Sequence, residues 1–251
     1  MSSSYPTLQD FFWADSLAIV KTSERFQSYA EFYTYIVDNL SQNSPETRRR
    51  YAGLIQRRFF PGHSLNDLVP TVWRSYHDES ILINLMRVTA LEGEPAIAQF
   101  VLTHILAQTP GSTLIPDIAR TFVKEIYGEF KEKSYRRLLQ TCRDLGFLGR
   151  YNGDLLVEQI QLPADALLIL LHYRLAPTPR IVRLSEIVET TWWRLLGLRQ
   201  VEDIRRILRR AEMAGLLSRY TKVDELEQVT TRYSRDEYLG QAMRLPMESR
   251  L

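Results

Sequence analysis

The chain has 251 residues, a net charge of +2, 45% hydrophobic residues and 25% charged residues, which is typical of a folded protein rather than a disordered or fibrous one. The single cysteine, Cys142, excludes an internal disulfide framework and a cysteine-cluster metal site, and it fits a reducing cytosol. The opening residues lack the pattern of a signal peptide, and the longest apolar stretch, about 162–173, is too short to cross a bilayer. We therefore expect a cytoplasmic protein with no membrane partner.

The first part of the chain is predicted to be helical, because apolar residues recur at intervals of three and four. Ser44-Pro45 is typical of a helix start, with the serine as N-cap, and this helix should end near Phe59, before the Pro-Gly pair at 61–62. Further helices are predicted over 65–76, 79–91 and 95–108. The Thr-Pro-Gly-Ser stretch at 109–112 predicts a linker, so we assign a helical N-terminal domain to residues 1–110.

The next segment has the order helix, helix, hairpin. Helices are predicted over 114–130 and from a Ser134 cap to Gly146, followed by strands over 147–151 and 155–162. Asn152-Gly153 between the strands is a strong hairpin signal, because both central positions of a type I′ turn need a positive φ. This order is that of a winged helix, so residues 111–163 are predicted to form a first winged-helix-like unit.

The last segment repeats this order. Helices are predicted over 165–175, 185–196 and 201–214, and strands over 216–221 and 227–233, with a turn near 223–225. Ser234 and Glu237 form a capping box for a final helix. Residues 164–251 are therefore predicted to be a second winged-helix-like unit with a C-terminal helix. The predicted fold is mainly α, with a helical N-terminal domain and two winged-helix-like units that carry small β-hairpin wings.

A repeat links the two units. Residues 135–151 and 204–220 align without a gap at an offset of 69, and seven of the seventeen positions are identical. In both copies a basic amphipathic helix ends at a glycine, Gly146 or Gly215, and an apolar strand follows at once. The repeat indicates two nucleic-acid-binding modules in one chain.

The small net charge conceals three basic segments. Residues 44–62, 120–151 and 199–222 each carry +4, so the remaining residues carry −10. Charge asymmetry of this kind indicates a polyanionic partner. Basic residues that merely cover solvated helix faces would give the same numbers, and the charge distribution leaves both interpretations open.

Arginines on the repeated helices are the main contact candidates, because a guanidinium group binds phosphates bidentately and reads guanine edges. On the second helix, Glu202 and Asp203 can neutralise part of the charge, and only Glu212 within the helix is spaced to pair with Arg209. The second copy is therefore expected to dominate. The predicted DNA contacts are Arg48, Arg49, Arg57, Arg136, Arg137, Gln140, Arg150, Arg205, Arg206, Arg209, Arg210 and Arg219.

No residue pattern indicates catalysis. Cys142 falls on the inward stripe of its helix, and the four histidines are far apart and in no metal-binding motif. There is no glycine-rich phosphate loop and no nucleophile elbow, and the Trp192-Trp193 pair is typical of a core anchor. We expect no catalytic residue, no metal and no cofactor, and therefore no enzyme.

The layout resembles the BrxA family of BREX (bacteriophage exclusion) phage-defence systems. The matching stretches are 36–59, with its Ser-capped basic helix, 81–106, which is apolar and helical, and 118–148, where a basic helix runs through a glycine into a strand. Together they cover roughly residues 10–170. The resemblance implies a cytoplasmic DNA-binding protein without catalysis of its own that acts with other BREX components.

The functional hypothesis is binding of double-stranded DNA, chiefly through its phosphates, as part of such a defence system. Two alternatives stay open at this point. One is a protein-interaction scaffold within the same defence complex, and the other is a winged-helix transcriptional regulator. RNA also stays open as a partner.

Overall fold

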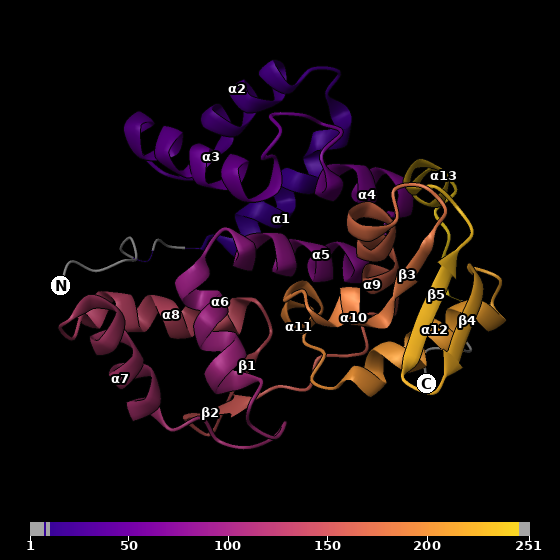
Figure 1. The fold of residues 1–251 in the computed structure, drawn as a ribbon. Helices are drawn as coiled ribbons and strands as arrows, with labels where there is room; N and C mark the ends of the chain where they lie inside the picture. Colours follow the sequence, from indigo (N-terminus) through magenta and orange to yellow (C-terminus); the bar gives the residue numbers. More distant parts are fainter. Residues whose placement is uncertain (1–7, 9–10, 246–251) are drawn as a thin grey trace.

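The computed structural model describes Leu8 and residues 11–245, and it is mainly helical, with two small antiparallel sheets (Figure 1). Its amino-terminal elements are α1 (Trp13–Thr22), the short 3-10 helix η1 (Ser23–Arg25), α2 (Tyr29–Asn39), α3 (Pro45–Phe59), α4 (Leu68–Tyr76) and α5 (Glu79–Glu92). The predicted start of α3 is confirmed, because Ser44 Oγ accepts a hydrogen bond from the Thr47 amide at 3.4 Å.

Helix α5 is the centre of the molecule. It crosses the middle of Figure 1 and contacts α3, α4, α6, α9 and α11. A helix that is apolar on nearly all sides has to be buried on nearly all sides, and most of this helix is buried. Its buried side chains include Leu82, Leu85, Met86 and Leu91. Helices from three parts of the chain therefore share one core.

The next elements form the first helix-and-hairpin unit. They are α6 (Pro95–Phe100), the π-helical turn η2 (Val101–Ile105), α7 (Pro116–Tyr127), α8 (Glu132–Asp144), β1 (Leu148–Tyr151) and β2 (Asp154–Val157). Asn152 and Gly153 both have a positive φ, of 50° and 95°, so the predicted hairpin turn is confirmed. The predicted Ser134 cap is wrong: α8 begins earlier, with Lys131 as its N-cap, and Ser134 is buried within the helix.

The predicted linker at 109–112 is also wrong in part, since its end joins the sheet. The Gly111 amide donates to the Val157 carbonyl at 2.7 Å, and the Val157 amide donates to the Ser112 carbonyl at 2.9 Å. Leu114 makes a similar bond to Leu155 at 2.7 Å. Residues 111–114 thus run along β2 on the side away from β1. The Pro-Gly composition correctly indicated a turn, but the pairing partner lies more than 40 residues further along the chain.

The second unit repeats this plan with longer strands. Its elements are α9 (Ala164–Leu170), the π-helical turn η3 (Leu171–Leu175), β3 (Ile181–Arg183), α10 (Leu184–Val188), α11 (Trp192–Leu195), α12 (Val201–Met213), β4 (Leu217–Val223), β5 (Leu226–Thr231) and α13 (Arg235–Gly240). The strand order is β3-β5-β4, so β3 takes the place that 111–114 takes in the first unit. The capping box of Ser234 and Glu237 at α13 is confirmed.

One local prediction in this unit is wrong, and one strand was not predicted. The single helix predicted over 185–196 is divided into α10 and α11, and Thr190 Oγ1 at the break donates to the Ile187 carbonyl at 2.6 Å. Threonine side chains compete in this way with helical hydrogen bonds. Strand β3, with three residues, was not predicted because it depends on pairing with the distant β5.

The sequence repeat corresponds to a structural one. Gly146 and Gly215 end α8 and α12 with φ of 77° and 73°. In each case the glycine amide bonds three residues back, and the next amide, that of Phe147 or Leu216, bonds five residues back, all at 2.9 Å. This pair of bonds is the Schellman motif, which needs a left-handed residue and therefore favours glycine.

Arginines of the second unit hold the end of η2. Arg199 donates to the carbonyls of Ile105 and Leu106 at 3.4 and 2.9 Å, and Arg194 donates to that of Leu102 at 3.0 Å. Carbonyl groups at a helix end have no partner within the helix, so these bonds satisfy them. The two units are therefore joined by specific contacts as well as by the chain.

We predict that Gly146→Ala and Gly215→Ala each lower the free energy of unfolding by about 1–2 kcal/mol, because an L-residue pays to adopt the left-handed conformation. Urea denaturation measures this effect. Gly53→Ala, in the middle of α3 with open space around it, is the control and should raise stability by up to about 1 kcal/mol. Equal effects at all three positions would contradict the assignment.

Candidate nucleic-acid interface

A groove lies between α8 and the β1–β2 hairpin of the first unit. It has a volume of about 700 Å³. Residues spaced by three and four share one face of a helix, and Arg136, Gln140 and Arg143 face the groove in this way. Arg150 of β1 lies on the groove as well. Of the sequence-predicted contacts, the structure brings together here Arg136, Arg137, Gln140 and Arg150.

The arginines of the groove differ in whether their side chains already have hydrogen-bond or ion-pair partners within the protein. Arg136 is largely exposed and pairs with Glu132 one turn away, at 2.6 Å, while Arg143 donates to Gln140 Oε1 at 3.2 Å. Arg137 is half-buried and donates to the Leu8 carbonyl at 2.7 Å. Arg150 is exposed and has no hydrogen-bond or ion-pair partner within the described part of the chain. The hairpin wall of the groove also carries one acid, Asp154. Positive charge therefore dominates the groove.

A buried arginine fixes the end of α8. Arg87 of α5 donates from Nε to the Leu145 carbonyl at 2.7 Å and from Nη1 to Asn84 Oδ1 at 2.6 Å. Its guanidinium group also lies 5.5 Å from the centre of the Phe147 ring. Burial lowers the pKa of Arg87 to about 10. Cations are favourable at the carboxyl end of a helix, so Arg87 holds the groove helix against the central helix. The role of Arg87 has no local signal in the sequence, because it depends on a distant helix end.

In the second unit, the arginine that aligns with Arg136 in the repeat is Arg205, and its side chain contacts another part of the same unit. Arg205 of α12 makes a bidentate contact with Glu227 of β5, with Nε and Nη2 at 3.0 and 2.7 Å from Oε2, and it also contacts Glu202 at 3.3 Å. Glu227 is buried, and it accepts from Tyr220 Oη at 3.0 Å and contacts Lys222 at 3.3 Å. The hydrogen bonds from Arg205 lower the pKa of Glu227 to about 2. Arg205 therefore fastens the hairpin to α12.

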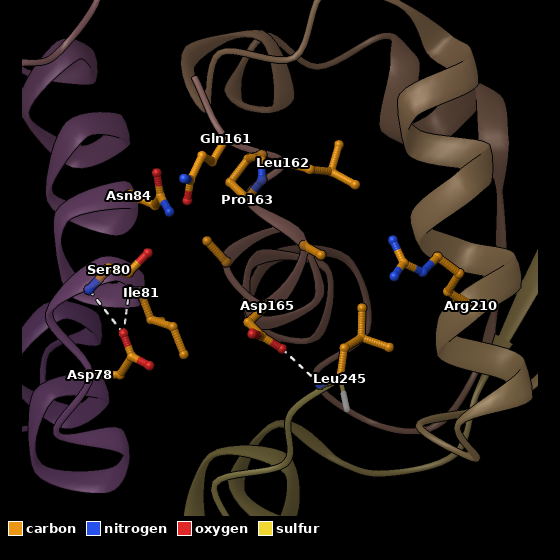
Figure 2. A pocket seen from close by; sticks show the side chains of 12 residues that line it. Asp78, Ser80, Ile81, Asn84, Gln161, Leu162, Pro163, Asp165, Arg210 and Leu245 are labelled. Atoms are coloured by element: carbon orange, nitrogen blue, oxygen red, sulfur yellow. Dashed lines mark hydrogen bonds between the residues drawn. The ribbon is translucent and has the colours of Figure 1, made fainter. Parts of the chain in front are cut away.

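The remaining arginines of α12 diverge. Arg206 pairs with Asp203 at 3.0 Å. Arg209 pairs with Glu202 at 3.3 Å, whereas spacing within the helix had indicated Glu212 as its partner. Figure 2 shows Arg210 reaching from α12 toward a cavity of about 290 Å³. The opposite walls of that cavity are the start of α5, with Asp78, and the start of α9. Arg205 and Arg209 thus share Glu202, while Arg206 pairs with Asp203 and Arg210 faces the cavity.

The other predicted contacts lie outside the groove. Arg48 donates to the Gln42 carbonyl at 3.1 Å, and Arg57 lies 3.8 Å from Glu94, which is already paired with the buried Arg58 at 2.5 Å. Arg49 is exposed on α3. Arg219 is exposed on β4, in register with Thr230. Arg48, Arg49 and Arg57 therefore lie together on α3, away from the groove.

The cysteine and the tryptophan pair lie in the core. Cys142 is fully buried, and burial raises the pKa of its thiol. Trp192 and Trp193 are buried, as predicted.

Among the described residues, no three His, Cys, Asp or Glu side chains lie where they could hold a metal ion. In the same part of the chain, no helix has the length and apolar character to span a membrane.

The chain has no match among protein-family models, curated proteins or solved structures.

We predict that Glu227→Gln lowers the free energy of unfolding at pH 7 by about 2–3 kcal/mol, because the Arg205 contact loses its charge. The folded pKa of Glu227 lies below the usual value of 4.5. Its contribution is therefore complete above pH 4.5 and is lost as the pH falls through about 2. The gap between wild type and variant, measured by urea denaturation, should narrow below pH 4.5. The matched control is Glu225→Gln in the exposed hairpin turn, which should behave as wild type at every pH.

Proposed function

We propose that this protein is a non-catalytic, double-stranded-DNA-binding protein, and that the groove between α8 and the β1–β2 hairpin is its principal contact with the phosphates. The observation that carries the proposal is the groove itself, where guanidinium groups from a helix and from a hairpin converge. Arg136 and Arg150 are exposed there, and Arg150 lacks a partner among the described residues. Groups of this kind bind phosphate oxygens with little loss of internal contacts.

The topology supports the same proposal. We interpret each unit as a winged helix: a helix, an edge strand, two helices and a hairpin whose last strand lies in the middle of the sheet. In the helix-turn-helix class the later helix of the pair enters the major groove, and α8 holds that position in the first unit. The hairpin then lies beside the helix and reaches the DNA backbone. On this interpretation Gln140 faces base edges or phosphates, and Arg136 and Arg150 contact phosphates.

The biological setting follows from the resemblance to the BrxA family. That family has the same order of elements: a Ser-capped basic helix, an apolar helix, and a basic helix that leads through a glycine into a strand. We propose that the protein serves a BREX-type anti-phage system as its DNA-binding component, in the cytoplasm. The groove is suited to sequence-tolerant binding, because phosphate contacts position a protein without reading bases.

A scaffold within the same defence complex is the second candidate, and one feature of the second unit favours it. The outer face of the β3-β5-β4 sheet exposes Ile181, Val223 and Leu226, at 53%, 58% and 47%. Val223 and Leu226 are paired directly across the hairpin. Exposed apolar side chains on one sheet face are typical of protein contacts. A scaffold role predicts loss of a co-purifying partner in Val223→Ser plus Leu226→Ser, with DNA binding unchanged.

We predict that Arg136→Gln plus Arg150→Gln weakens binding to a labelled DNA duplex about tenfold near ~50 mM salt, and lowers the magnitude of the log–log salt slope by about 2. Fluorescence anisotropy at several salt concentrations measures both values. The matched control is Arg210→Gln, which removes one charge from the cavity of Figure 2 and should bind as wild type. Absence of wild-type binding near ~50 mM salt would refute the DNA-binding function.

A further inference from the structure

Helix α3 carries a half-buried glycine, Gly53, on the side opposite its buried residues. The buried residues of this helix are Tyr51, Ala52, Leu54, Ile55, Arg58 and Phe59. On a helix with 3.6 residues per turn, the position opposite the centre of that set is Gly53. A Cβ atom added at Gly53 would meet nothing within 4 Å, and its φ is an ordinary helical one. Neither packing within the protein nor backbone conformation therefore requires a glycine here.

Glycine is costly at such a place. In an exposed helix interior it is less favourable than alanine by about 1 kcal/mol, and straight-chain residues are nearly as good as alanine. A glycine that opens the helix backbone serves the close approach of another molecule. The bare patch at Gly53 therefore points to a partner that lies against α3.

The residues around Gly53 indicate the charge of that partner. Arg49, Arg50 and Arg57 flank Gly53 on the same face, one turn to either side of it. Arg49 has no partner in the described part of the chain, and Arg50 donates to the neighbouring Tyr51 hydroxyl at 3.2 Å. Arg57 is exposed and shares Glu94 with Arg58, at 3.8 Å. None of the three has a carboxylate to itself.

One acid belongs to this face. Glu46 lies in the first turn of α3, where its charge complements the positive end of the helix dipole. The rest of the face is cationic, and Arg50 and Arg57 are separated by about 10 Å along the axis, at 1.5 Å per residue. Guanidinium groups therefore lie on either side of the bare backbone at Gly53.

We infer that the outer face of α3, centred on Gly53 and flanked by Arg49, Arg50 and Arg57, is a second docking surface for the phosphate backbone of duplex DNA, separate from the α8 groove. None of its arginines lines that groove, and α3 lies at the upper left of Figure 1 while α8 lies below it. The inference rests on the proposed DNA-binding function and extends it to the amino-terminal helices. At Gly53 the backbone of α3 is uncovered, so the DNA strand lies against the helix itself and does not touch only the ends of long side chains.

The test is Gly53→Leu in the full-length chain, with anisotropy against the same labelled duplex. The leucine adds bulk at the bare patch and removes no charge, and it favours the helix, so the variant stays folded with an unchanged or raised melting temperature. We expect binding to weaken about fivefold or more near ~50 mM salt. The matched control is Ala30→Leu, at an exposed position of the neighbouring α2, which should bind within about twofold of wild type.

A second variant checks the charges. Arg49→Gln plus Arg57→Gln should lower the magnitude of the salt slope by about 2, since two phosphate contacts are lost. If Gly53→Leu binds as wild type while the groove variant Arg136→Gln plus Arg150→Gln stays weakened, the α3 surface is refuted and the groove is retained. Equal weakening by Ala30→Leu also refutes the α3 surface. A wild-type protein that binds no duplex refutes both.

Discussion

The hydrogen bond from Arg87 to the Leu145 carbonyl joins the central helix α5 to the end of α8, and the position of the groove depends on it. A buried guanidinium group is expensive, and burial lowers the pKa of this one to about 10. The carbonyl end of a helix, the Asn84 amide oxygen and the Phe147 ring compensate it without a carboxylate. Because the same helix end carries the Gly146 turn into β1, one contact sets both the angle of α8 and the start of the hairpin that forms the other wall of the groove.

The two units share a plan but differ in what their arginines do, and strand length explains the difference. In the first unit β1 ends at Tyr151 and the turn follows immediately, so the hairpin leaves the outer side of α8 open. In the second unit β4 continues past Tyr220 to Val223, and the longer β5 returns with Glu227 in register with Lys222. That carboxylate takes up Arg205. The first unit therefore gathers its arginines along one groove, whereas the second unit uses Arg205 to hold its hairpin.

Several elements could be predicted because their signals are local. Ser44-Pro45, the Asn152-Gly153 turn, the glycine ends of α8 and α12 and the Ser234 capping box each depend on residues within one turn of each other. The failures share the opposite property. The edge strand 111–114 depends on β2, and β3 depends on β5, so neither has enough local pattern to be recognised. The fates of the arginines are also non-local, since Arg137 contacts Leu8 and Arg199 contacts the end of η2.

The sequence alone determined most of the helices, the repeated turn from helix to strand and the residues that carry the positive charge, because periodicity, caps and glycine φ preferences act over a few neighbouring residues. Only the tertiary structure decided which charges face outward. Arg136 and Arg150 come together across a groove, Arg205 is held by Glu227, and Arg210 faces a cavity. The reason is physical: an arginine side chain is long and flexible, and its environment is set by whichever carbonyl or carboxylate the packing of distant elements brings within reach.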